Sequence, residues 1–403
     1  MARNFLQLVI FLCLCATSSI VIAAENEDYP VVDSNTILSS GYLSSTYHRV
    51  ESVDIEDGFY HFIVESDIGS FNIHSLALFK KRVNEIKTIS RAITTYEQRD
   101  DEFSGELRSQ LRISSDSAVD LLTSPLNTAS NLAGQLAGNL NATLTGEDAF
   151  IYQSNKLASY EPKDPTTATH KRNIAFQLGL DLYTNNLKVQ SFLNTVANAR
   201  SSGKVSAGIG LSNDIINVDE TDLKIKYLIK NKTLAELNYH NSETLSKMGI
   251  SSKLIEKFIQ HPILSPSNKT IITAYLSKLE NVSRLNHFIE LAVTTNNEVQ
   301  ASIYERLSKK LWVYHNNYEK LTTFYNYQGQ PAFITDRRKI VFIDTADLVI
   351  WSADNKAHYD KFAIHALKSG YKDWEIVSFG ELSPLANKEL NELAFTHKVI
   401  LSE

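Results

Sequence analysis

Residues 59–93 read FYHFIVESDIGSFNIHSLALFKKRVNEIKTISRAI. The first part, 59–65, is rich in aromatic and β-branched residues, so it predicts a strand, and Asp57 and Gly58 precede it as a turn pair. Beyond residue 75 the apolar period lengthens from two residues to about 3.6, which is typical of an amphipathic helix. One helical face is apolar and contains Leu76, Phe79, Val83, Ile86, Ile89 and Ile93. We therefore expect a β-meander, with strands near 47–55, 59–65 and 70–74, packed against a long helix.

The sequence pattern divides the rest of the chain into regions. Residues 160–172 hold two prolines in a polar run, which predicts a linker. A helical stretch follows, in which Thr233 opens one helix through a capping box, Ser265 and Pro266 open another, and a long helix is expected over 298–324. The predicted fold class is therefore α+β and mainly helical. Its expected parts are a β-meander and helical N-terminal region (25–160), a helical region (161–325) and a small α/β region of alternating strands and helices (326–403).

Residues 1–24 have the layout of a secretory signal peptide. Arg3 is followed by an apolar stretch over 5–16, and Ala23 and Ala24 come directly before acidic residues. The alternative is an N-terminal membrane anchor. We expect cleavage after Ala24 and export to the periplasm or beyond. No later stretch has about 18 consecutive apolar residues, so no transmembrane helix is expected after cleavage.

Composition excludes several classes of protein. The chain carries 40 Lys and Arg against 46 Asp and Glu, a net charge of −6, which argues against a nucleic-acid partner. The cysteines are Cys13 and Cys15, both inside the predicted signal peptide. A cleaved chain without cysteine has no thiolate catalysis, zinc–cysteine site or iron–sulfur cluster. We predict no cofactor.

Three histidines of the meander are the candidate metal ligands. His48, His61 and His74 stand 13 residues apart, each on a predicted strand. The turns expected near residues 57 and 68 would place them at different levels of the sheet. We therefore favour ordinary surface or cross-strand histidines over a metal site.

Asp344 and Asp347 are the candidate catalytic acids, because they follow an apolar strand, where α/β proteins often place such groups. A hydrolase that uses the pair is one hypothesis. A strand end followed by an N-capping aspartate is the interpretation that we favour. The sequence contains no Gly-x-Ser-x-Gly, His-Glu-x-x-His or Walker motif that would supply a nucleophile, zinc or phosphate site.

An uncharged amphipathic helix is expected over 126–144, where Gly134 and Gly138 lie beside an apolar face of Leu and Ala. Small residues four positions apart let helix backbones approach closely. Such a helix fits tight packing inside its own domain, which we favour because it lacks the basic face that anionic lipids attract. The alternative is a membrane-active protein that inserts this helix.

Three segments carry a family resemblance: LGLDLYTNN at 178–186, FIQHPILSP at 258–266 and DLVIW at 347–351. On these segments the chain resembles an uncharacterised family of exported, largely helical bacterial proteins without assigned function. The resemblance implies a Gram-negative periplasmic setting and supplies no catalytic residue. Since no catalytic group converges in the sequence, we expect a non-enzymatic exported protein that binds a ligand or supports the envelope. Its partner is not indicated beyond an envelope protein or a membrane surface.

Overall fold

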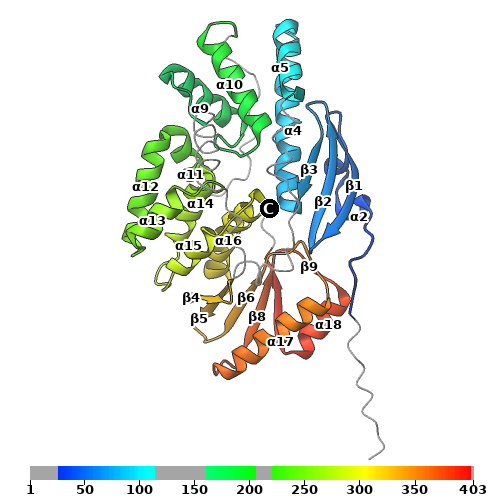
Figure 1. Cartoon of the computed structure of the whole chain (residues 1–403), viewed down its shortest axis with the longest axis vertical. Helices are drawn as coiled ribbons and strands as arrows, with labels where there is room; N and C mark the ends of the chain where they lie inside the picture. Colours follow the sequence, from blue (N-terminus) through cyan, green and yellow to red (C-terminus); the bar gives the residue numbers. More distant parts are fainter. Residues whose placement is uncertain (1–25, 114–159, 206–219, 401–403) are drawn as a thin grey trace, which may run out of the picture.

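The computed structural model describes residues 26–113, 160–205 and 220–400. The predicted signal peptide over 1–24 and the expected helix over 126–144, with Gly134 and Gly138, lie outside the described residues. Helices account for 54% of the structure and strands for 18%, which confirms the α+β, mainly helical fold class. In Figure 1 the N-terminal part (blue to cyan) and the helices of the middle region (green to yellow) lie side by side above the C-terminal part (orange to red).

The N-terminal part is an antiparallel meander that packs against a long helix. Two short helices, α2 (Ser34–Ile37) and α3 (Ser40–Leu43), precede the strands β1 (His48–Glu56), β2 (Phe59–Ser66) and β3 (Phe71–His74), which pair in that order. Helices α4 (Leu76–Glu97) and α5 (Asp101–Ile113) follow. The predicted apolar face is confirmed, because Phe79, Val83 and Ile86 are fully buried and Phe79 stacks on Phe62 of β2.

The middle region is helical, as predicted. Its helices are α9 (Pro165–Leu178), α10 (Leu187–Ser201), α11 (Glu220–Asn231), α12 (Leu234–Lys247), α13 (Ser252–Ile259), α14 (Pro266–Leu276), α15 (Asn286–Ala292) and α16 (Glu298–Asn317). The predicted capping box at Thr233 opens α12, and Ser265 caps α14 ahead of an N1 proline. These local signals were strong enough to place both helix starts correctly.

Two expectations in this region are wrong. Residues 160–172 are not a linker, because α9 begins at Pro165. Asp164 caps that helix by accepting a 2.7 Å hydrogen bond from Thr167 N, and a proline at the first position has no N–H to satisfy. The long helix does not reach residue 324. It ends at Asn317, and the β-branched and aromatic residues after Leu321 form a strand instead.

The C-terminal part is a five-stranded mixed sheet with helices, which confirms the predicted alternation of strands and helices. Its strands are β4 (Leu321–Tyr327), β5 (Gln330–Thr335), β6 (Ile340–Asp344), β8 (Trp374–Ser378) and β10 (Phe395–Val399), in the order β10-β8-β6-β5-β4. Strands β6, β8 and β10 are parallel, joined through α17 (Ala353–Lys368) and α18 (Pro384–Glu392). The short strands β7 (Leu348–Val349) and β9 (Glu381–Leu382) pair beside this sheet.

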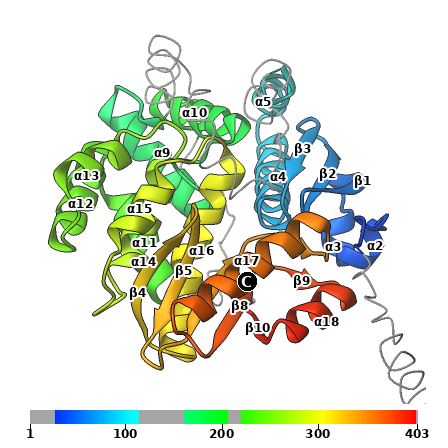
Figure 2. The ribbon, with the colours of Figure 1, turned by 60° about the horizontal axis from the view of Figure 1, so that its bottom comes forward.

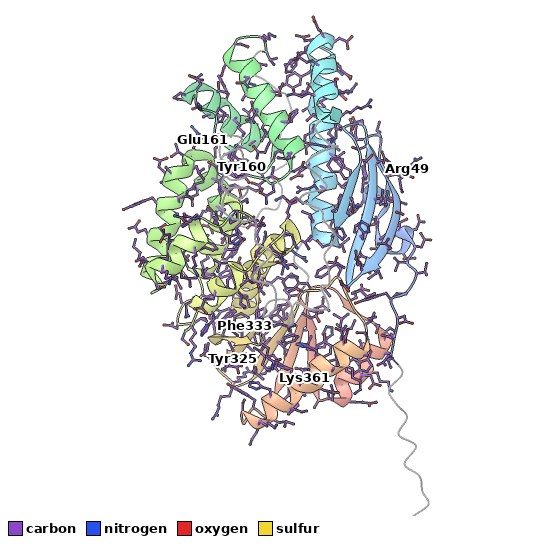
Figure 3. The ribbon with its side chains drawn as sticks, viewed as in Figure 1. Arg49, Tyr160, Glu161, Tyr325, Phe333 and Lys361 are labelled. Atoms are coloured by element: carbon purple, nitrogen blue, oxygen red, sulfur yellow. The ribbon has the colours of Figure 1, made fainter. Side chains whose placement is uncertain are left out.

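Helices cover both faces of the five-stranded sheet. On β6, Ile340 and Phe342 pack into the core shared with α17 and α18, whereas Val341 and Ile343 pack into the core shared with α14, α15 and α16. This alternation follows from the two-residue period of a strand. Figure 2 shows α17 crossing one face of the sheet while α16 lies behind it. Among the side chains labelled in Figure 3, Phe333 of β5 lies in the sheet and Lys361 lies on α17, while Arg49 lies on the meander.

The hydrophobic cores run across the predicted region boundaries. One core joins the meander, α4 and α5 to α9 and α10, for example through Val189 and Phe192. A second core joins helices of the middle region to the sheet, for example through Leu307 of α16 and Phe333 of β5. The three predicted regions therefore share their cores.

The backbone of the C-terminal part makes close contacts with the backbone of the meander. The carbonyl oxygen of Gly58, in the β1–β2 turn, accepts hydrogen bonds of 2.9 Å from both Asp347 N and Leu348 N. On the other side of the same segment, Gly380 lies so close that a Cβ atom there would overlap the carbonyl group of Asp347. The turn, the segment after β6 and the segment after β8 therefore meet with no space for a side chain.

We expect Gly380→Ala to lower the free energy of unfolding by about 3 kcal/mol, because the added methyl group forces two backbone segments apart. Urea titration followed by circular dichroism measures this change. Gly105→Ala is the control, because its added methyl group meets no atom within 4 Å and Gly105, like Gly380, has no positive φ. An equal loss in both variants would contradict the close-contact explanation.

The segment that precedes α2 is bound to the C-terminal part. Glu27 N donates to Trp351 O at 2.9 Å, and the Glu27 carboxylate accepts from Trp351 N at 2.8 Å. The same carboxylate oxygen accepts from the hydroxyl of Ser383, the N-cap of α18, at 2.5 Å. The start of the described chain is therefore anchored more than 300 residues further along the sequence.

Candidate functional site

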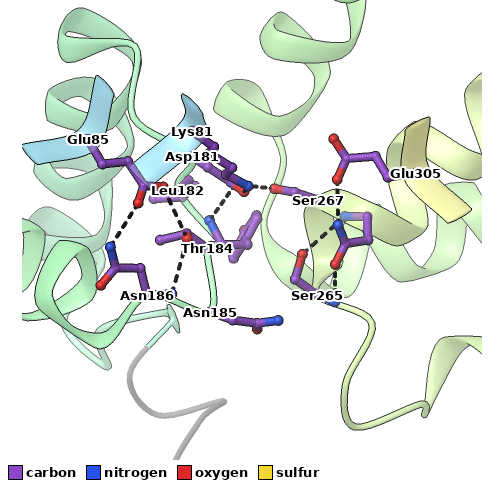
Figure 4. Close-up of polar contacts among 12 residues, drawn as sticks. Lys81, Glu85, Asp181, Leu182, Thr184, Asn185, Asn186, Ser265, Ser267 and Glu305 are labelled. Carbon is purple, nitrogen blue, oxygen red and sulfur yellow. Dashed lines mark hydrogen bonds and ion pairs between the residues drawn. The ribbon is translucent and has the colours of Figure 1, made fainter. Parts of the chain in front are cut away.

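A polar recess lies where four segments meet: α4, the connection between α9 and α10, the start of α14, and α16. Its cavity volume is about 30 Å³, or about 330 Å³ when the open space at its mouth is included. The residues that line it are mostly charged or hydrogen-bonding, namely Leu78, Lys81, Asp181, Asn185, Ser265, Asn268, Glu298, Ser302 and Glu305. Figure 4 shows several of these side chains converging from separate elements. We take this recess as the candidate functional site.

The connection between α9 and α10 is shaped by its own side chains. Gly179 ends α9 in the left-handed conformation, with φ at 67°. Asp181 Oδ1 accepts from Tyr183 N at 3.1 Å, Thr184 Oγ1 accepts from Asn186 N at 3.1 Å, and Asn186 caps α10. Such turns of Asp, Thr and Asn fix a loop without regular structure. They place the Asp181 carboxylate at the recess.

Asp181 connects three of the four segments. Its Oδ2 pairs with Lys81 Nζ of α4 at 3.0 Å, and its Oδ1 accepts from Ser267 Oγ of α14 at 2.5 Å. Burial would raise the pKa of Asp181, but the Lys81 ammonium and the Ser267 hydrogen bond outweigh it and lower the pKa. Burial opposes the charge of Lys81, yet the carboxylates of Asp181, Glu305 and Glu85 raise its pKa. Both groups are therefore ionised at neutral pH.

Glu305 is the carboxylate in the recess that forms no ion pair among the described residues. Its Oε2 accepts from Asn268 Nδ2 at 2.5 Å, and no Lys or Arg in the described part of the chain lies within ion-pair distance of it. The Asn268 amide is held in turn by a capping box with Ser265. Burial is the largest influence on Glu305 and raises its pKa, and the nearby Asp181 adds to this while Lys81 opposes it.

A buried charge network stands beside the recess and fixes its walls. Arg82 of α4 is 5% exposed, donates to Glu85 Oε2 at 2.6 Å and also bonds Glu298 of α16. Glu85 accepts from Asn186 Nδ2 at 2.8 Å and from Thr184 Oγ1 at 3.4 Å. One arginine therefore positions α4, α16 and the α9–α10 connection relative to one another.

A second network of hydrogen bonds, made by Lys171 and Gln190, supports the α9–α10 connection. Lys171 is fully buried, and its Nζ donates to Tyr160 O at 2.9 Å and to Gln190 Oε1 at 2.8 Å. The Gln190 amide then donates to the carbonyl oxygens of Leu182 at 2.8 Å and Thr184 at 3.1 Å. Burial lowers the pKa of Lys171 to about 7. Figure 3 places Tyr160 on the helical side of the molecule, where this network begins.

The candidate histidine His48 does not join the other two. Its Nδ1 lies 2.7 Å from Ser45 Oγ and its Nε2 lies 2.9 Å from Tyr42 O, so both ring nitrogens are engaged near the start of β1. The residue is 3% exposed, and burial lowers the pKa of its imidazole. His48 therefore holds in place the segment that precedes β1.

The expectation that all three histidines lie at different levels is wrong for His61 and His74. These residues are direct cross-strand partners on β2 and β3, and their rings stack with centroids 4.3 Å apart. The tight β2–β3 connection sets this register. His61 Nδ1 also lies 3.0 Å from Asp54 Oδ1, and its Nε2 bonds Asn72. Burial, with a smaller contribution from His61, lowers the pKa of His74 to about 4.

Asp347 binds backbone groups of the meander and of α4. Its Oδ2 accepts from Leu76 N, at the start of α4, at 2.7 Å, and from Tyr60 N of β2 at 3.3 Å. The side chain is buried, and this burial raises the pKa of Asp347 to about 6 even though both hydrogen bonds lower it. It acts as a capping group for a helix far away in the sequence.

Asp344 has different partners. Its Oδ1 accepts from Ala346 N at 2.9 Å, and its Oδ2 bonds the hydroxyl of Tyr359 on α17. Neither it nor Asp347 lines the recess. The hypothesis of a catalytic pair stays a prediction, with both carboxylates engaged inside the protein.

A serine–histidine contact that the sequence did not indicate lies at the ends of the parallel strands. Ser378 Oγ lies 2.9 Å from His397 Nε2 and 2.6 Å from Gly380 O. Because the hydroxyl donates to the Gly380 carbonyl, it accepts from the imidazole, which is the reverse of nucleophile activation. Ser378 is also fully buried. We therefore interpret the contact as structural, as part of the packing at the edge of the sheet.

The residues in and beside the recess were missed by sequence reasoning, although two signals were present. Arg82 and Glu85 stand three residues apart inside the apolar face of α4, next to Val83 and Ile86, where charge is unexpected. Asp181 lies within the polar turn that carries part of the family resemblance. Either signal marks buried polar residues that need partners from another segment.

Comparisons with protein-family models, with curated proteins and with solved structures give no match for this chain. In the described part of the chain, no cluster of three or more His, Cys, Asp or Glu side chains has the arrangement of a metal site. None of the helices described is both long and apolar enough to cross a bilayer.

Proposed function

We propose that the chain is an exported, non-enzymatic binding protein whose ligand occupies the polar recess. The observation that carries the proposal is the recess itself. It gathers charged and amide side chains from four segments, and an outer layer built on Arg82 and Gln190 holds the walls in place. Prearranged polar groups in a concave site favour binding, because little ordering remains to be done when the ligand arrives.

The other hypotheses from the sequence have less support. A hydrolase based on Asp344 and Asp347 would need carboxylates that face a substrate, whereas both groups bind neighbours within the fold. The membrane-active helix over 126–144 lies outside the described residues. Export rests on the signal-like sequence of residues 1–24.

The test compares the cleaved protein with Ser302→Trp, which fills the recess from α16, and with Ser302→Ala as the matched control. We expect at least one member of a panel of small amines, polyols, amino acids and carboxylates to raise the Tm of the wild-type protein by several degrees. The tryptophan variant should lose this shift and the alanine variant should keep it. Near-ultraviolet circular dichroism verifies that each variant is folded.

No stabilisation by any compound, or equal stabilisation of both variants, would overturn the recess as the binding site. Robust hydrolysis by the purified chain that disappears in Asp344→Ala would overturn the non-enzymatic assignment.

A further inference from the structure

The charges around the recess do not balance. Its lining contains one ammonium, that of Lys81, against the carboxylates of Asp181, Glu298 and Glu305. Lys81 pairs with Asp181, and Glu298 pairs with Arg82 from outside the lining. Glu305 accepts a hydrogen bond from the Asn268 amide, and Lys81, which is paired with Asp181, acts on it only from beyond ion-pair distance. Among the described residues, the two carboxylates of Asp181 and Glu305 therefore share the charge of Lys81, and Glu305 has no ion pair of its own.

The neighbouring pair shows that an ammonium group suits this environment. Lys81 Nζ lies 3.0 Å from Asp181 in the same recess, so a primary ammonium already forms a charge-assisted hydrogen bond there. The hydroxyl of Ser302 and the carboxylate of Glu305 offer further acceptors on α16. An anionic ligand would face three carboxylates instead.

The chemistry of the lining also favours one kind of cation over others. None of the described residues that line the recess is aromatic, so a quaternary ammonium would lack the ring faces that usually hold it. The described residues also form no group of metal ligands. A cation that carries N–H donors is the one that this set of carboxylate and hydroxyl oxygens can bind.

We propose that the recess binds a small organic molecule through a primary ammonium group, with Glu305 as its counter-ion. This inference rests on the proposed binding function and specifies the class of ligand. Burial raises the pKa of Glu305, and an ammonium neighbour would lower it. Lys81 remains paired with Asp181, so the ammonium group of the ligand pairs with Glu305.

The experiment titrates n-propylamine, 1,2-propanediol, propionate and tetramethylammonium into the folded protein at neutral pH, followed by calorimetry. Concentrations extend to about 50 mM, because such small ligands bind weakly. The variants are Glu305→Gln, which has nearly the shape of a protonated glutamate, and Glu290→Gln as the matched control. Glu290 lies on α15, outside the recess, with an exposed side chain.

We expect propylamine to bind the wild-type protein and Glu290→Gln equally, and to bind Glu305→Gln about tenfold or more weakly. The other three probes should bind less well than propylamine. Glu305→Asp provides a second test, since it keeps the charge and should keep part of the affinity.

Two outcomes would overturn the inference in distinguishable ways. If the diol or propionate binds better than propylamine and Ser302→Trp removes that binding, the recess remains a binding site but not for an ammonium. The same conclusion follows if Glu305→Gln leaves propylamine binding unchanged. If no probe binds and the broader panel gives no stabilisation either, both the ligand class and the binding function fail.

Discussion

Arg82→Met is expected to lower the free energy of unfolding by about 5 kcal/mol, because it leaves two carboxylates without their shared cation. Arg82 and Glu85 are both about 5% exposed, and the Glu298 side chain is 18% exposed. Methionine replaces much of the volume of the arginine side chain, so the loss reports charge and hydrogen bonding more than packing. Chemical denaturation at neutral pH measures it.

Arg49→Met is the matched control for this change. Arg49 pairs with Glu51 on the meander, but its side chain is 71% exposed, so the expected loss is below about 0.5 kcal/mol. Adding Glu85→Gln and Glu298→Gln to Arg82→Met should recover part of the stability, since no buried carboxylate is then left without its cation. A loss of less than about 2 kcal/mol in Arg82→Met would contradict the buried network.

The second large effect is expected for Asp347→Ala, which should cost about 4 kcal/mol at pH 4.5. The variant leaves the backbone N–H groups of Leu76 and Tyr60 without an acceptor inside the protein, and each such group costs about 1–3 kcal/mol. Asp347→Asn is the matched control. Both hydrogen bonds reach a single carboxylate oxygen, and an amide oxygen can accept both.

The Asp347 prediction also has a pH dependence of defined sign. Burial raises the pKa of Asp347 to about 6 from its ordinary value of 3.8, so the folded state binds this proton more tightly than the unfolded chain does. Lowering the pH from 7.5 to 4.5 should therefore stabilise the wild-type protein, relative to Asp347→Asn, by about 2 kcal/mol. Urea titrations of both proteins at the two pH values measure the difference. A difference that does not change with pH, or changes the other way, would contradict a buried, protonatable Asp347.

Local elements of this fold were predictable because their signals lie close together in the sequence. The apolar face of α4, the capping box at Thr233 and the N-cap with N1 proline at Ser265 and Pro266 each depend on a few neighbouring residues. The two errors in the helical region arose where one residue type has two uses. Pro165 can mark a linker or open a helix, and the aromatic run after Asn317 suits a helix face as well as a strand.

The recess was beyond prediction from local pattern for a different reason. Lys81, Asp181, Asn268 and Glu305 come from four segments, and their meeting depends on how the segments pack. The segment around Asp181 was noted in the sequence only for its family resemblance, which did not indicate its partners. Likewise, the favoured interpretation was a strand end followed by an N-capping aspartate, whereas Asp347 accepts from the start of α4, 271 residues away in the sequence.

The anchoring of Glu27 on Trp351 and Ser383 has a consequence for the order of folding. Segments made early cannot take their final positions until segments made late have emerged, because their hydrogen bonds span 324 and 356 residues. Contacts of such long sequence separation form slowly, since a large loop must close before they provide any stabilisation. A chain with this connectivity should complete its native structure only after synthesis has passed residue 383, and a chain arrested earlier should hold its N-terminal segment loose and open to proteases.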